Sequence, residues 1–289
     1  MGSVIDPHKL PVVDLSGFDA GDRSWRQRVA AQVDQASCSF GSFQIVGHGV
    51  ESSLMETLAE LNSKLFGQGF PGDEISFGPA TARARGRGRA RQVGRSRQNV
   101  LAFPELPGLN EAVEDYLTAM TGLGHKLMTT FARGLGLQDS YFVDHYTGNP
   151  DTLLRVITHS SSAARKPTRA PRSRRPAAGE LLTLVRPDDA GGLELWFPYQ
   201  RLEVDAVPGA LVCHVGPALE RMSCGRYPAT RHHLRSTSSS LQLSLVFSFD
   251  PGVALVPEPI CEAADLPGTG RFVPEQANTI RSAVRSGSV

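Results

Sequence analysis

The C-terminal half of the chain is a series of short β-rich segments, and this pattern restricts the fold more than any other feature of the sequence. Apolar and β-branched residues gather in four stretches bounded by Gly, Pro or Asp, namely Leu181–Val185, Leu193–Phe197, Ala210–Val215 and Leu241–Phe249. Short strands separated by such turn residues are typical of a sandwich, barrel or jelly roll. We therefore predict an α+β, mainly β fold whose core is built from these strands.

The N-terminal half alternates between predicted strands and predicted helices. Apolar runs predict strands at Leu10–Leu15 and Phe40–Val46. Apolar residues at helical spacing predict amphipathic helices from Ser24 to Ser37, from Val50 to Phe66 and from Leu109 to Leu135. We expect these helices to pack on the outside of the strands.

The length of 289 residues fits a single domain with added helices. We divide it into an N-terminal region (1–105), a helical support (106–150), a strand-rich core (151–255) and a C-terminal extension (256–289). No run approaches the roughly 18 apolar residues of a membrane span, so no membrane partner is expected. The four cysteines lack metal-ligand spacing, and the N-terminus has no basic start followed by an apolar run; together these features favour a cytoplasmic protein with reduced thiols. We expect a monomer.

Two arginine-rich islands interrupt this pattern, at residues 80–97 and 160–179. Together they hold 13 of the 30 Lys and Arg residues. The rest of the chain is therefore acidic, although the formal net charge is only +1.

Three interpretations of the islands stay open. Clustered arginines can bind the phosphates of nucleic acid, but the first island has no interleaved aromatic residue to stack on bases, which makes a nucleic-acid partner the weaker interpretation. A solvated insertion is the plainer alternative, because such segments have too little apolar surface to order themselves. The mixture of Arg, Ala, Gly, Pro and Ser is also what high-GC codons give when read out of frame, so compensating frameshifts are a third hypothesis.

Several segments, in order, carry a family resemblance. They are LPVVDLS (10–16), FGSFQIVGHGV (40–50), LLTLVRPDDAGGLEL (181–195), VPGALVCHVGPALERMSCGRYPATRHH (207–233) and LSLVFSFDP (243–251). These segments resemble the isopenicillin N synthase-like, Fe(II)- and 2-oxoglutarate-dependent oxygenases. The resemblance implies a double-stranded β-helix (jelly-roll) core with flanking N-terminal helices. It also places His48 at a structural turn rather than at a metal site.

The resemblance implies a non-haem Fe(II) held by two His and one carboxylate, and most of that set is missing here. The first His and the carboxylate would fall at or beside Pro176 and Ala178, neither of which can bind iron. Glu180 is the nearby carboxylate, although its register differs by two residues. The second metal-binding His falls on His232, which has a structural alternative as a histidine packed beside a strand without metal. His214 occupies a position where relatives carry Asn; it is either a replacement ligand or a core histidine.

The co-substrate site implied by the resemblance is also altered. The family's R-x-S motif, which binds 2-oxoglutarate, aligns with Gln242 and Ser244, so Ser is kept and Arg is lost. Gln carries no charge and cannot replace the guanidinium fork. His159 stands where relatives carry a Tyr that contacts the same co-substrate.

The sequence thus leaves two functional hypotheses. By resemblance the protein is an oxidoreductase, an Fe(II)- and 2-oxoglutarate-dependent dioxygenase acting on a small molecule, with secondary metabolism as one setting for such a reaction. The alternative is a catalytically inactive pseudoenzyme of the same fold, without bound cofactors.

Overall fold

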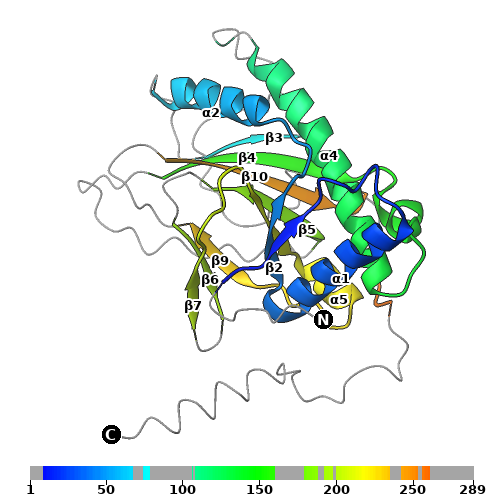
Figure 1. Cartoon of the computed structure of the whole chain (residues 1–289). Helices are drawn as coiled ribbons and strands as arrows, with labels where there is room; N and C mark the ends of the chain where they lie inside the picture. Colours follow the sequence, from blue (N-terminus) through cyan, green and yellow to red (C-terminus); the bar gives the residue numbers. More distant parts are fainter. Residues whose placement is uncertain are drawn as a thin grey trace, which may run out of the picture.

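The computed structural model describes residues 9–67, 74–78, 106, 108–159, 179–187, 192–197, 200–234, 242–252 and 256–260 (Figure 1). Both arginine-rich islands lie outside these residues, apart from Gly179, as do the aligned positions Pro176 and Ala178. Within the described ranges, no helix is long and apolar enough to cross a membrane.

Two β-sheets form the centre of the molecule. The larger sheet has seven strands in the order β1-β2-β8-β5-β10-β4-β3. Their bounds are Val12–Asp14 (β1), Ser42–Val46 (β2), Leu211–Val215 (β8), Leu182–Arg186 (β5), Gln242–Asp250 (β10), Asp151–His159 (β4) and Glu74–Phe77 (β3). The smaller sheet has the order β7-β6-β9, with bounds Arg201–Glu203, Leu193–Trp196 and Arg231–Leu234. This pair of sheets is the jelly-roll core that the sequence predicts.

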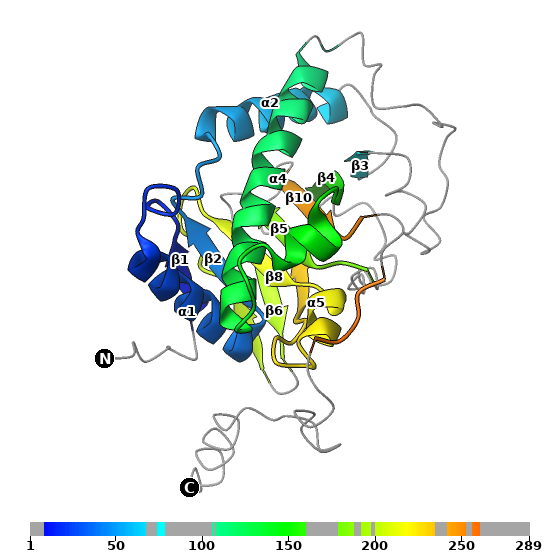
Figure 2. The same cartoon turned by 90° about the vertical axis from the view of Figure 1, so that its right-hand side faces the viewer.

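Helices cover the face of the larger sheet that points away from the smaller one (Figure 2). They are α1 (Arg23–Phe40), α2 (Ser52–Gly67) and α4 (Leu109–Gly134), with a short π-helix η1 (Val143–Thr147) and a short helix α5 (Pro217–Met222). The three predicted helices are therefore present. Sequence periodicity did not predict η1 or α5, because a single turn carries too few residues to show a helical period.

Helix α1 runs three residues further than predicted because of the residues that cap it. The Asp22 side chain accepts a hydrogen bond from the Trp25 N–H at 2.7 Å and so begins the helix. Gly41 ends it in the left-handed region, with φ of 60°, and its N–H donates to Ser37 O. Phe40 is consequently the last residue of the helix rather than the first of the strand, and β2 starts at Ser42.

The alternation of side chains along the strands gives the larger sheet two different faces. Phe43, Leu154, Leu184 and Phe247 lie in the main core together with buried residues of α1, α2 and α4. The opposite face contributes to a second apolar cluster, which the smaller sheet completes with its own side chains (Val185, Val212, Val246, Leu193, Leu195, Leu202). Burying each of these apolar side chains contributes about 1.5–3 kcal/mol. The second cluster marks the interior between the two sheets.

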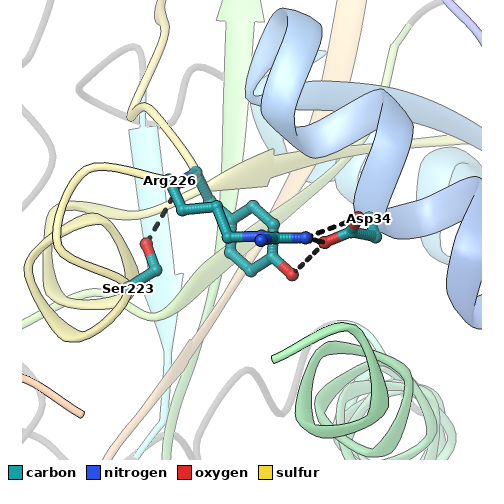
Figure 3. Close-up of polar contacts among 4 residues, drawn as sticks. Asp34, Ser223 and Arg226 are labelled. Atoms are coloured by element: carbon teal, nitrogen blue, oxygen red, sulfur yellow. Dashed lines mark hydrogen bonds and ion pairs between the residues drawn. The ribbon is translucent and has the colours of Figure 1, made fainter. Parts of the chain in front are cut away.

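A polar cluster joins α1 to the loop that leads into β9 (Figure 3). The Arg226 guanidinium donates to both carboxylate oxygens of Asp34, with two distances of 2.8 Å, and the Tyr227 hydroxyl donates to Asp34 at 2.6 Å. The Tyr227 N–H donates to Ser223 Oγ at 3.2 Å. These bonds hold in place the chain segment that delivers His232 to the interior.

The cysteines depart from the expectation of reduced thiols at one position. Cys224 is disulfide-bonded, whereas Cys38 and Cys213 are free. Burial, and next the Asp34 carboxylate, raise the pKa of the Cys38 thiol to about 11, so this thiol stays protonated at neutral pH.

Candidate functional site

Two histidines meet in the interior between the sheets. His214 lies on β8, opposite Thr183 of β5 and Ser42 of β2. His232 lies on β9, opposite Leu195 of β6, which belongs to the interior apolar cluster. Because directly opposed residues of an antiparallel pair share a face, His232 points toward the larger sheet. The two rings stack with their centroids 3.9 Å apart and their planes 9° from parallel.

Each of the two rings has a nitrogen without a hydrogen bond to the described part of the chain. Ser42 Oγ and His214 Nδ1 are joined by a hydrogen bond of 2.8 Å. His214 Nε2 and His232 Nδ1 are both buried, and neither has such a bond. Unsatisfied buried nitrogens of this kind are costly unless a ligand, metal or proton uses them. The pair is therefore a site where an additional group would be stabilised.

Burial keeps both imidazoles neutral. It is the main cause that lowers the pKa of His232 to about 4; the nearby Thr230 backbone acts in the opposite direction, and the positive charge of Arg155 lowers the pKa further. Burial, and then the neighbouring His232, lower the pKa of His214 well below its ordinary value. Neutral imidazole is the form that binds metals, so the protonation state of the pair suits a ligand role at pH 7.

The residues present do not fit the three-ligand iron site of the resemblance. Among the described residues, no group of three or more His, Cys, Asp and Glu side chains is placed to hold a metal ion. Residues 160–178, which span the aligned positions, contain no His, Asp or Glu in the sequence. Glu180 is buried, and its carboxylate accepts a hydrogen bond of 3.4 Å from Ser248 Oγ. The described interior thus supplies two imidazoles without the carboxylate that completes the set.

The aligned co-substrate residues lie on β10 and are buried. Gln242 is opposite His159 of β4, and Ser244 is opposite Ile157. Ile157 packs against the interior cluster, which places Ser244 on the interior face together with its partner. Gln242 is two residues away along the strand and shares that face.

Sequence reasoning missed one charged residue on the same face. Arg155 of β4 lies opposite Val246 of β10, and Val246 belongs to the interior cluster. Arg155 Nε is buried and has no hydrogen-bond partner among the described residues. In the sequence, Arg155 lies between Leu154 and Val156, which are both apolar and prove to be buried. Because successive side chains of a strand point to opposite faces, this alternation predicts that Arg155 points away from the face of Leu154 and Val156.

His48 has a structural role, as the sequence indicated. One ring nitrogen, Nε2, is bonded to Gly209 O at 2.9 Å, and the other, Nδ1, accepts from the Val50 N–H at 3.1 Å. Both nitrogens are therefore used to hold a turn.

A cavity of about 270 Å³ lies outside the interior and is lined by residues of α4 and of the segment around η1. One of its lining atoms, His125 Nδ1, is buried without a hydrogen bond to the described residues. Because it contains neither of the interior histidines, we assign the candidate site to the space between the sheets.

Comparisons with known proteins identify the family of the chain. Residues 10–70 match the model of the non-haem dioxygenase N-terminal region, described for morphine synthesis, and residues 153–251 match the 2OG-Fe(II) oxygenase superfamily. A 1-aminocyclopropane-1-carboxylate oxidase of Dictyostelium mucoroides is 24% identical, over 88% of this chain and 85% of that protein. Gibberellin 20 oxidase 5 of Arabidopsis thaliana is 26% identical, over 82% of this chain and 67% of that protein.

Solved structures of the same kind share the fold. The structure of JOX2 in complex with 2OG, Fe and JA superimposes with a TM-score of 0.69 at 19% identity, over 91% of this chain and 85% of that chain. A 2OG-Fe(II) oxygenase family protein from Caulobacter crescentus gives a TM-score of 0.67 at 18% identity, over 96% of this chain and 98% of that chain. With both family models matched in order and the jelly-roll core in place, the chain belongs to the isopenicillin N synthase-like superfamily of Fe(II)- and 2-oxoglutarate-dependent oxygenases.

Proposed function

We propose that this protein is a dioxygenase-type oxidoreductase that acts on a small molecule held between its two sheets. Membership of the superfamily, whose cofactors are Fe(II) and 2-oxoglutarate, supports the reaction class. The single observation that supports the location is the stacked pair of His214 and His232, whose remaining nitrogens are buried in the interior. In this proposal the two imidazoles are the metal-binding groups of the chain, and at least one ring turns out of the stack so that both nitrogens point at the same ion.

A second candidate function is favoured by one specific observation. Among the described residues, no third His, Cys, Asp or Glu is placed with the two histidines to hold a metal ion, and the sequence offers none at the aligned positions. A member of the fold without the complete ligand set would bind its small molecule without catalysis. Two imidazoles alone hold a divalent ion weakly compared with the family's three ligands.

Metal binding separates the two candidates. We would titrate Mn(II), a redox-inert surrogate for Fe(II), into the purified full chain by calorimetry, with and without 2-oxoglutarate. The oxidoreductase proposal predicts 1:1 binding in the micromolar range that 2-oxoglutarate strengthens and that His232→Gln and His214→Gln each weaken about tenfold or more. His233→Gln is the matched control, because residue 233 faces away from the interior, opposite Glu194. If wild-type protein binds no Mn(II), the non-catalytic candidate replaces the oxidoreductase.

The partners of the protein follow from the same site. We propose a small-molecule substrate, because side chains of the two sheets are close enough to stack on each other across the interior. We also propose that the protein acts as a monomer. Size-exclusion chromatography with light scattering tests the second point, and a mass of twice 31.1 kDa would contradict it.

A further inference from the structure

The interior holds a cation without a counter-charge among the described residues. Arg155 stands on the strand face that Ile157 shares, and Ile157 packs against the apolar cluster between the sheets. Its guanidinium lies near enough to His232 for its charge to contribute, after burial, to the lowered pKa of that ring. Histidine is either neutral or positively charged, so neither ring can balance this charge.

The Arg155 Nε is buried and makes no hydrogen bond within the described ranges, which is unusual for a group that carries five donors in a fixed fork. Glu74 of β3 is a carboxylate close in register, but it lies opposite Ile157 rather than opposite Arg155. Arg155 as a whole is half-buried, but a buried N–H of a charged group without a partner is still costly, and an anion that enters the interior would remove that cost.

The residues around Arg155 suit a carboxylate. On β10, Val246 lies directly opposite Arg155 of β4. Ser244 is two residues from Val246 and lies opposite Ile157, so it is a diagonal neighbour of Arg155 across the β4–β10 pair. Diagonal neighbours of this kind are roughly 7–8 Å apart, which a long side chain can span. The planar guanidinium and a serine hydroxyl together match the two oxygens of a carboxylate.

We propose that Arg155, with Ser244, binds a carboxylate group of the 2-oxo acid co-substrate, in place of the arginine that is absent at Gln242. This inference rests on the proposed function for the identity of the anion. The site has moved from β10 to the neighbouring strand β4 while keeping the serine. A carboxylate bound there faces the same interior as His214 and His232, and it would neutralise the half-buried cation.

The test is calorimetric titration of 2-oxoglutarate into the full chain, once with EDTA and once with Mn(II). Arg155→Gln should weaken binding about 10- to 100-fold in both conditions, which is the effect of losing a charge-assisted pair. Arg155→Lys should give an intermediate loss, because Lys keeps the charge but not the fork. Arg231→Gln is the matched control. It removes the same charge from exposed residue 231, which is adjacent to His232 on β9, and it should leave the affinity unchanged.

A rescue variant distinguishes the loss of the guanidinium from misfolding as the cause of weaker binding. Arg155→Gln combined with Gln242→Arg returns a guanidinium to the position that the family uses, and it should recover most of the lost affinity. Thermal unfolding of each variant establishes that the fold is retained; if Arg155→Gln does not fold, the lysine and rescue variants decide.

The outcomes separate this inference from the proposed function. If the wild-type protein binds 2-oxoglutarate and Arg155→Gln changes this affinity less than about twofold, the role of Arg155 is overturned. The oxidoreductase proposal then stays in place. Binding that depends on Arg155 but occurs without any Mn(II) binding supports the anion site and overturns the oxidoreductase proposal. No binding of 2-oxoglutarate to wild-type protein in either condition overturns both.

Discussion

Ser42 and His214 are 172 residues apart in sequence, yet Ser42 Oγ lies 2.8 Å from His214 Nδ1 inside the larger sheet. The bond joins β2 to β8 at a register point where the two residues stand opposite each other. It fixes one nitrogen of His214 and directs the other, Nε2, into the interior. The orientation of the candidate site therefore depends on a strand from the N-terminal half of the chain.

Replacing Ser42 by Ala should destabilise the protein. The substitution leaves His214 Nδ1 buried without a partner, and an unsatisfied buried group of this kind costs about 1–3 kcal/mol. Chemical denaturation at pH 7 measures the difference in free energy of unfolding. Ser37→Ala is the matched control, since Ser37 Oγ is also buried but has no hydrogen bond to the described residues to lose. Equal losses in the two variants would contradict a role for the Ser42–His214 bond.

The stability of the protein should fall as the pH falls below about 6.5. The pKa of His232 is about 4 in the folded protein and 6.5 in the unfolded chain. Between these two pH values the unfolded chain therefore binds a proton that the folded protein does not bind. The contribution of His232 to the free energy of unfolding is fully present above pH 6.5. It is lost progressively as the pH falls to about 4, and it does not change further below that pH. The loss is at most between about 3 and 4 kcal/mol for this residue. His214 changes stability in the same direction.

The pH effect is measured as the free energy of unfolding at pH 7 and pH 5. His232→Gln should reduce the difference between the two values, because Gln does not titrate. His233→Gln, at the neighbouring outward position, should change the difference much less, because His233 is the smallest of the causes that lower the pKa of His232. A wild-type protein equally stable at both pH values would show that the interior histidines are not held neutral.

Asp34 should contribute more to stability than an ordinary surface carboxylate. Its side chain accepts from the Arg226 guanidinium and from the Tyr227 hydroxyl, and the Tyr227 side chain is fully buried. Burial, and next the hydrogen bond to Asp34, raise the pKa of Tyr227, so its hydroxyl keeps the proton that it donates. Asp34→Ala leaves the Tyr227 hydroxyl without an acceptor, and it should lower the free energy of unfolding by about 2–3 kcal/mol.

A surface ion pair provides the comparison for Asp34. The Asp19 side chain is mostly exposed and pairs with Lys126 at 2.6 Å, so Asp19→Ala should cost no more than about 1 kcal/mol. Tyr227→Phe should cost less than Asp34→Ala, because it removes one bond and leaves no hydroxyl unpaired. Denaturant titration of the three variants checks the order, and the reverse order would contradict a structural role for the cluster.

Local pattern predicted the existence of the elements better than their ends. The helical spacing of apolar residues in Ser24–Ser37 predicted α1. The end of the helix, however, is set by the left-handed backbone conformation of Gly41, and the spacing of apolar residues carries no information about that conformation. Gly41 also lies in contact with the Pro228 carbonyl, so a side chain at this position is excluded by a residue far away in sequence. Such long-range contacts are not contained in any local window.

The candidate site was predictable only in part. The resemblance pointed to His214 and His232, but it gave no reason for their rings to stack, which depends on how β8 and β9 face each other across the interior. Arg155 was missed although it lies among four apolar residues, Leu153, Leu154, Val156 and Ile157. The pattern shows that it faces away from Leu154 and Val156, but it does not show whether that face is the interior or the solvent. Whether His232, His214 and Glu180 bind metal, and whether Gln242 and Ser244 bind co-substrate, stay predictions.

Two glycines of α4 should respond in opposite directions to the same substitution. Gly122 has nothing within 4 Å of the position that a Cβ would occupy, whereas at Gly124 a Cβ would lie 2.5 Å from the Phe249 ring. Gly122→Ala should stabilise the protein by about 0.5–1 kcal/mol through helix propensity. Gly124→Ala gains the same propensity but forces the buried Phe249 ring of β10 to move, which should give a net loss of about 1–2 kcal/mol. Thermal and chemical unfolding of the two variants compare the effects directly. A stabilising Gly124→Ala would mean that α4 does not pack on β10 as closely as the structure has it, and the interior face of β10, which carries Ser244 and Gln242, would then be less firmly positioned.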